Sequence, residues 1–153
     1  MNLIEVKGLK KSYGDVHAVR GVDLEIPQGE IFSLLGPNGA GKTTTVEILE
    51  GFRTRDAGSV SVLGFDPQTR GRESRIWRNR IGIILQNSSD ADDLTVAEIM
   101  KHFSGYYSNP RNVDEVIYSV GLMEKESALI RNLSGGQRRR LDVALGIIGS
   151  PEL

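Results

Sequence analysis

Cysteine is absent from this sequence of 153 residues, so disulfides and thiolate metal sites are excluded and a reducing compartment is permitted. No apolar run approaches the roughly 18 residues that a membrane-spanning helix needs. The N-terminal residues lack the basic and apolar regions of a signal peptide. The sequence has no large excess of either charge, because 19 basic and 20 acidic residues give a net charge of −1. A general electrostatic attraction to nucleic acid or to an anionic membrane is therefore not expected. We therefore expect one ordinary globular domain that does not enter a membrane.

The strongest motif is a glycine-rich stretch that fits the phosphate-loop pattern of Gly, four residues, then Gly-Lys-Thr. A triphosphate needs several backbone N–H groups that point at one spot, and a glycine-rich loop at a helix N-terminus supplies them. Lys42 is placed to reach the β- and γ-phosphates, and the hydroxyl of Thr43 is placed to hold Mg²⁺. The nucleotide-binding residues predicted here are Gly36, Pro37, Asn38, Gly39, Ala40, Gly41, Lys42, Thr43 and Thr44.

Strand and helix signals alternate around this loop. An apolar run at residues 31–35 predicts a strand before it, and residues 44–50 predict a helix after it, which is the order that the motif requires. Gln86 follows an apolar run typical of a parallel strand, at the edge where such sheets bind ligands. The chain is therefore predicted to be an α/β protein that binds ATP or GTP. The other strands are expected at residues 3–7, 22–26, 59–63 and 81–85.

Two aromatic residues each have two interpretations. Tyr13 lies in an early loop, and its ring either packs against the protein or stacks on a nucleotide base. Trp77 lies in the arginine-rich segment 70–80, which either contacts nucleic acid or forms a solvated helix face. Glu73 favours the solvated face, because it can pair with neighbouring arginines.

The second half of the chain carries helix signals. Thr95 and Glu98 predict a capping box for a helix to about residue 107, and Asn112 predicts the cap of another to residue 120. A further helix is predicted to begin at the sequence Leu-Ser-Gly-Gly-Gln, capped by Ser134 and Gln137. Its apolar stripe comprises Leu141, Ala144, Leu145 and Ile148.

The first turn of this last helix contains two glycines, and their presence there requires a physical explanation. Gly135 and Gly136 each weaken the helix by about 1 kcal/mol. Close approach of a charged ligand to a bare helix N-terminus supplies that explanation. The chain therefore contains a second helix start that is suited to phosphate.

Together these motifs resemble the nucleotide-binding domain of an ABC (ATP-binding cassette) ATPase, over the whole chain. They stand in the family's order: Tyr13, the phosphate loop, Gln86 and the signature at residues 133–137. The resemblance implies a P-loop NTPase fold of the ABC type, with antiparallel N-terminal strands, a parallel-sheet core and an inserted helical subdomain. Residues 138–146 are similar to the antibiotic- and multidrug-resistance type of exporter.

The resemblance also implies a mechanism. Two such domains close head to tail, so that MgATP on one phosphate loop is covered by the other domain's signature, while Tyr13 stacks on adenine. Lys42 and Gln86 act in catalysis, and Thr43 and Gln86 bind Mg²⁺. The implied subunit couples ATP binding and hydrolysis to export of a small molecule, and a separate transmembrane permease holds it at the cytoplasmic face of the membrane. No direct nucleic-acid partner is expected. The signature residues that contact ATP are Ser134, Gly135, Gly136 and Gln137.

The family continues, after residues matching 150–153, into a strand that supplies the Walker B aspartate and the catalytic glutamate. The resemblance thus implies a single partial domain, incomplete at the C-terminus, and a 153-residue chain that binds ATP without useful hydrolysis. Its expected parts are an N-terminal β and phosphate-loop core at residues 1–86, a helical subdomain at about 87–140 and a return toward the core at about 141–153.

Two alternative functions stay open. One is a soluble ABC protein that acts on ribosomes or nucleic acid, supported only by the arginines around Trp77. The other is a non-catalytic nucleotide-binding module, which a missing Walker B strand would fit. Salt-sensitive binding to RNA or DNA would favour the first, and co-purification with a membrane protein would favour the transporter.

Overall fold

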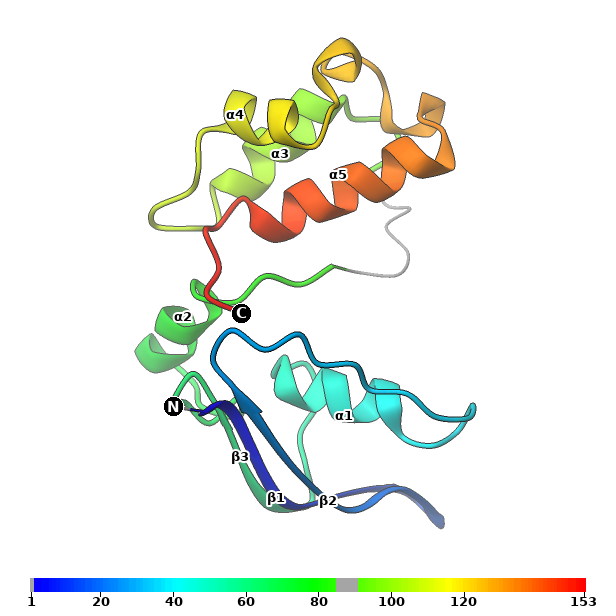
Figure 1. The fold of residues 1–153 in the computed structure, drawn as a ribbon, viewed down its shortest axis with the longest axis vertical. Helices are drawn as coiled ribbons and strands as arrows, with labels where there is room; N and C mark the ends of the chain where they lie inside the picture. The colour runs from blue at the N-terminus through cyan, green and yellow to red at the C-terminus, as the bar shows by residue number, and fades with distance from the viewer. Residues whose placement is uncertain (1, 85–90) are drawn as a thin grey trace. The chain divides into compact units, whose positions relative to one another are not determined.

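The computed structural model describes residues 2–84 and 91–153. The chain divides into two compact units, one up to Trp77 and the other from Arg78 onward. The first unit contains β1 (Asn2–Tyr13), β2 (Val16–Pro27), α1 (Lys42–Leu49) and β3 (Ala57–Val62). Helix α2 (Arg72–Arg78) also belongs to this unit, except for its last residue. The second contains α3 (Val96–Ser104), α4 (Val113–Ser119), the 3-10 helices η1 (Met123–Lys125) and η2 (Ile130–Asn132), and α5 (Gly135–Ile147). Figure 1 labels the α-helices and the strands of both units.

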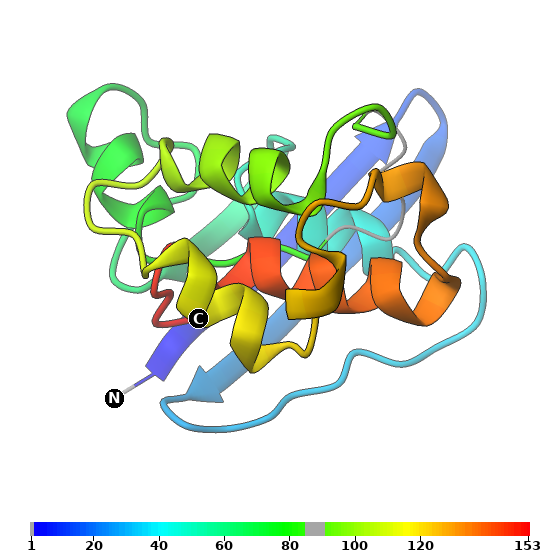
Figure 2. The same ribbon diagram turned by 90° about the horizontal axis from the view of Figure 1, so that it is seen from above.

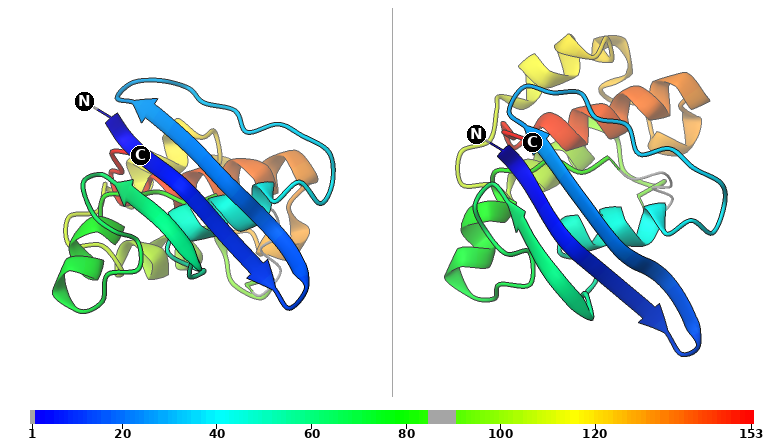
Figure 3. Two further views of the ribbon diagram at one scale, coloured as in Figure 1. Left: turned by 90° about the horizontal axis from the view of Figure 1, so that it is seen from below. Right: turned by 60° about the horizontal axis from the view of Figure 1, so that its bottom comes forward.

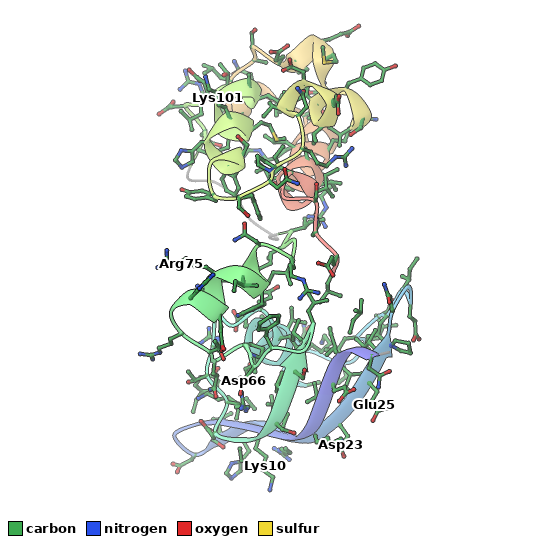
Figure 4. All side chains as sticks on the ribbon, turned by 90° about the vertical axis from the view of Figure 1, so that its left-hand side faces the viewer. Lys10, Asp23, Glu25, Asp66, Arg75 and Lys101 are labelled. Atoms are coloured by element: carbon green, nitrogen blue, oxygen red, sulfur yellow. The ribbon has the colours of Figure 1, made fainter. Side chains whose placement is uncertain are left out.

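The first unit is built on an antiparallel sheet with strand order β2-β1-β3. Buried and exposed side chains alternate along β1: Ile4 and Val6 are buried, whereas Glu5 and Lys7 are exposed. Helix α1 crosses one face of this sheet, as both views of Figure 3 show, and its Ile48 is fully buried. The predicted antiparallel N-terminal part is therefore confirmed. Figure 4 shows Asp23 and Glu25 on β2, both of which are exposed.

The predicted parallel strands are not formed in the part of the chain that the structure describes. Residues 31–35 have no regular structure, and neither have residues 81–84. A parallel strand needs a neighbour for its N–H and C=O groups, and none of the described residues forms a ladder with either segment. As a consequence Ile31 is 97% exposed and Leu35 is 86% exposed. An apolar run alone was therefore insufficient to predict these strands.

The second unit is a helical unit in which α3, α4 and α5 pack on one another (Figure 2). The predicted caps are confirmed: Thr95 begins α3, Asn112 begins α4 and Ser134 begins α5. No helix within residues 2–84 and 91–153 is long and apolar enough to cross a membrane. The subdomain boundaries at residues 86 and 140 stay a prediction. The buried core comprises Val96, Ile99, Met100, Val116, Ile117, Leu122, Ile130, Leu141, Ala144 and Ile148.

Candidate functional site

The phosphate loop leads into α1 and is exposed throughout residues 36–40. Gly39 and Gly41 have φ angles of 81° and 80°, in the left-handed region that glycine adopts without strain. Lys42 folds back over the loop, and its Nζ donates hydrogen bonds of 2.7 Å to the carbonyl oxygens of Gly36 and Pro37. An anion that reaches the loop therefore meets a positive charge held by the backbone.

Helix α1 begins without a side-chain cap. Its N-cap residue is Gly41, whereas the N-cap side chains of α3, α4 and α5 each accept a hydrogen bond from a backbone N–H of the first turn. The first N–H groups of α1 therefore remain available to a ligand, and the helix dipole favours an anion there. Thr43, predicted to bind Mg²⁺, is exposed in the same turn.

Tyr13 and the start of α1 lie at the same end of the β1–β2 hairpin. A Cβ atom on Gly41 would lie 2.2 Å from the carbonyl oxygen of Ala18, so α1 begins directly against β2. Ala18 is two residues from Val16, which pairs with Tyr13. The hairpin register thus brings the residue predicted to bind the base near the helix predicted to bind the phosphates.

Two cations lie against the ring of Tyr13, which is 42% exposed. The Nζ of Lys11 is 5.5 Å from the ring centroid, and the Cζ of Arg53 is 5.6 Å from it. Neither contact was predicted from the sequence. Lys11 had a readable signal, because residues two apart on a strand share a face. Arg53 follows α1, and no periodicity in the sequence relates it to Tyr13.

The signature belongs to the second unit, where it forms the start of α5. The predicted capping box is present: Ser134 Oγ accepts from the N–H of Gln137 at 3.3 Å, and Gln137 Oε1 accepts from the N–H of Ser134 at 2.9 Å. A Cβ atom on Gly135 or Gly136 would have no described heavy atom within 4 Å. Packing among the described residues therefore does not explain these glycines, and their exposed backbone is open to a ligand.

Two further predictions concern Gln86 and Trp77. Gln86 lies outside the described residues, so its proposed contacts with Mg²⁺ and phosphate stay a prediction. Trp77 is fully buried, and the arginines of α2, among them Arg75 in Figure 4, are exposed. This arrangement fits the solvated helix face, because a buried indole ring cannot stack on bases.

A family model described as ABC transporter matches residues 19–153. The chain belongs to the ABC transporter family. The chain is 39% identical to the Nod factor export ATP-binding protein I of Rhizobium sp. (strain N33), over 98% of this chain and 50% of that one. It is 38% identical to the daunorubicin/doxorubicin resistance ATP-binding protein DrrA of Streptomyces peucetius, over 98% of this chain and 46% of that one. The chain thus spans about half the length of these relatives.

The fold agrees with this family. A solved structure described as the ATP binding subunit of an ABC transporter superposes with a TM-score of 0.83 at 21% identity, over 97% of this chain and 63% of that one. This likeness confirms the fold class, a P-loop ATPase fold of the ABC type.

Proposed function

We propose that this chain is the ATP-binding part of an ABC exporter. In this proposal MgATP binds to the phosphate loop, and the signature of a second ABC domain covers it in a head-to-tail dimer. The observation that carries the proposal is the start of α1, where uncapped N–H groups adjoin the ammonium of Lys42. At the signature, Gly135 and Gly136 leave the backbone of a second helix start exposed to the same anion.

Magnesium fits the residues at this loop. No group of three or more His, Cys, Asp or Glu side chains among the described residues could hold a metal ion. Mg²⁺ commonly binds through substrate phosphates, waters and few protein groups, and the exposed hydroxyl of Thr43 suits such a site. We propose Thr43 and Gln86 as its protein contacts. When bound, the ion neutralises charge on the β- and γ-phosphates.

We also propose that the cargo passes through a separate transmembrane permease. Relatives are described as export or resistance ATP-binding proteins, which supports export of a small molecule. The ATP-binding part would then lie at the cytoplasmic face of the membrane, bound to the permease. Affinity purification of the tagged native protein from detergent-solubilised membranes tests this, and recovery with RNA or ribosomes instead of a membrane protein would contradict it.

ATP binding is the decisive test of the proposed function. Loss of the Lys42 ammonium removes charge-assisted hydrogen bonds to phosphate, so Lys42→Ala should weaken MgATP binding by about ten-fold or more in calorimetry. Lys101→Ala is the matched control, since Lys101 is an exposed lysine on α3, labelled in Figure 4. Equal affinities for the wild type and Lys42→Ala would overturn the proposal.

A further inference from the structure

Arg53 is fixed to α1, the helix that begins at the phosphate loop. Its Nε donates to a carboxylate oxygen of Glu47, and its backbone N–H donates to the Glu47 carbonyl oxygen at 3.0 Å. The backbone N–H of Phe52 donates to the same carbonyl at 2.9 Å. The side-chain contact with Glu47 therefore positions the guanidinium, and the two backbone hydrogen bonds hold the segment that carries it. The hydrogen bond to Glu47 also raises the pKa of Arg53 above its usual value.

Lys11, the other cation beside the ring of Tyr13, is held by Asp56. The Nζ of Lys11 donates to Asp56 Oδ1 at 2.8 Å, and the backbone N–H of Ser12 donates to Asp56 Oδ2 at 2.7 Å. Both hydrogen bonds lower the pKa of Asp56, and the one from Lys11 has the larger effect. Each cation beside Tyr13 is thus held in place by its own carboxylate.

We propose that Arg53 is a second base-contact residue, which together with the ring of Tyr13 forms the base end of the nucleotide site. The inference rests on the proposed function. Its geometry is the 5.6 Å separation of the guanidinium carbon from the ring centroid, so a purine stacked on the exposed part of the ring lies within reach of the guanidinium. Guanidinium groups bind purines by stacking on the ring and by hydrogen bonds to ring nitrogens.

The role of Glu47 follows from the same contacts. Glu47 is a positioning residue, since it touches Arg53 and reaches the base only through it. Helix α1 rises ~1.5 Å per residue, so Lys42 and Glu47 are separated by ~7.5 Å along its axis. One rigid helix therefore sets the spacing between the phosphate end and the base end of the site.

The test separates base binding from phosphate binding by comparing MgATP with inorganic tripolyphosphate, which has no base. Arg53→Ala should weaken ATP binding about two- to five-fold, as expected for an exposed cation–π and stacking contact, and should leave tripolyphosphate affinity unchanged. Arg53→Lys keeps the charge without the planar guanidinium and should restore only part of the loss. Arg70→Ala is the matched control, since Arg70 is an exposed arginine of the same unit.

Coupling to Tyr13 supplies the second readout. Tyr13→Ala should weaken ATP binding to the same extent and leave tripolyphosphate affinity unchanged. In the double variant, the fold-loss of ATP affinity should be smaller than the product of the two single fold-losses, because both residues contact one base. Unchanged ATP affinity in Arg53→Ala, or an equal loss for tripolyphosphate, would overturn the inference. A wild type that binds neither compound would instead overturn the proposed function, and a wild type that binds both equally would overturn only the base site.

Discussion

Arg138 donates a hydrogen bond of 2.7 Å to the carboxylate of Asp92, which lies 46 residues earlier in the chain. The same guanidinium nitrogen donates to the carbonyl oxygen of Ile130 at 3.1 Å. The backbone adds to this connection, because the N–H of Ile130 donates to the Leu94 carbonyl at 2.9 Å. The first turns of α5, which carry the signature, are thereby tied to the segment that precedes α3 and to η2.

Removal of this ion pair should loosen the start of α5. Asp92→Ala is expected to lower the free energy of unfolding by about 0.5–1 kcal/mol, a modest value because both side chains are partly exposed. Amide hydrogen exchange in the first turns of α5 should accelerate. Asp93→Ala is the control, since Asp93 is 87% exposed in its pair with Arg131, and its effect should be close to zero. Equal effects of the two substitutions would show that the Arg138 contact does not matter.

Two glycines of the phosphate loop should differ sharply in their tolerance of alanine. Both have a left-handed φ, which costs an alanine about 1–2 kcal/mol. Gly39→Ala should show only that cost, since a Cβ there meets no described atom within 4 Å. Gly41→Ala should lose about 1–3 kcal/mol more, because its Cβ would meet the carbonyl of Ala18 at 2.2 Å. Urea unfolding of both variants measures the difference, and equal losses would contradict this packing.

The capping box of α3 should make the second unit sensitive to acid. Two hydrogen bonds from Thr95 lower the pKa of Glu98 below its ordinary value of 4.5. The one from the backbone N–H has the larger effect, and the one from the hydroxyl has the smaller. A carboxylate whose pKa is depressed in the folded state contributes stability above 4.5, and that contribution disappears as the pH falls through the folded pKa.

Comparison with Glu98→Gln isolates this contribution. Glutamine keeps a capping oxygen without a titrating group, so the variant's stability should change less between neutral pH and acid below 4.5 than that of the wild type. The measurement is thermal unfolding across this pH range. Parallel pH profiles for the two proteins would contradict the assignment to Glu98.

Local signals in the sequence predicted local structure well. The caps at Thr95, Asn112 and Ser134 were predictable because a cap joins residues three positions apart. The start of α1 directly after the glycine-rich loop was predictable for the same reason, since loop and helix lie in one short segment. The phosphate-binding role of that loop stays a prediction. Family resemblance then extended these local signals to the fold and to the ATP-binding role.

Contacts between distant residues escaped prediction. The strand at residues 31–35 was wrong because pairing depends on a neighbouring strand, which an apolar run does not specify. The cation beside Tyr13 at Arg53 and the partner of Arg138 at Asp92 come from segments that only the fold brings together. Surface side chains of this kind carry no periodicity by which the sequence identifies their partners.

Replacing the signature glycine Gly136 with alanine should raise the stability of the chain and lower its function. Gly136→Ala adds a methyl group in the first turn of α5 where no described atom lies within 4 Å. It is expected to stabilise the chain by about 0.5–1 kcal/mol. Gly146→Ala, in the same helix, should destabilise it, since its Cβ would lie 2.7 Å from Cγ1 of Ile84.

ATP-dependent association then distinguishes function from folding. If the backbone of α5 covers the triphosphate on a second copy, the methyl group of Gly136→Ala blocks that approach and reduces the ATP-induced dimer seen by sedimentation, even though the variant is more stable. MgATP affinity of the single chain should be unchanged, because the phosphate loop lies elsewhere in the sequence. A variant that dimerises with ATP as well as the wild type would mean that Gly136 is not needed for close approach to the nucleotide, and the head-to-tail arrangement would lose its main support.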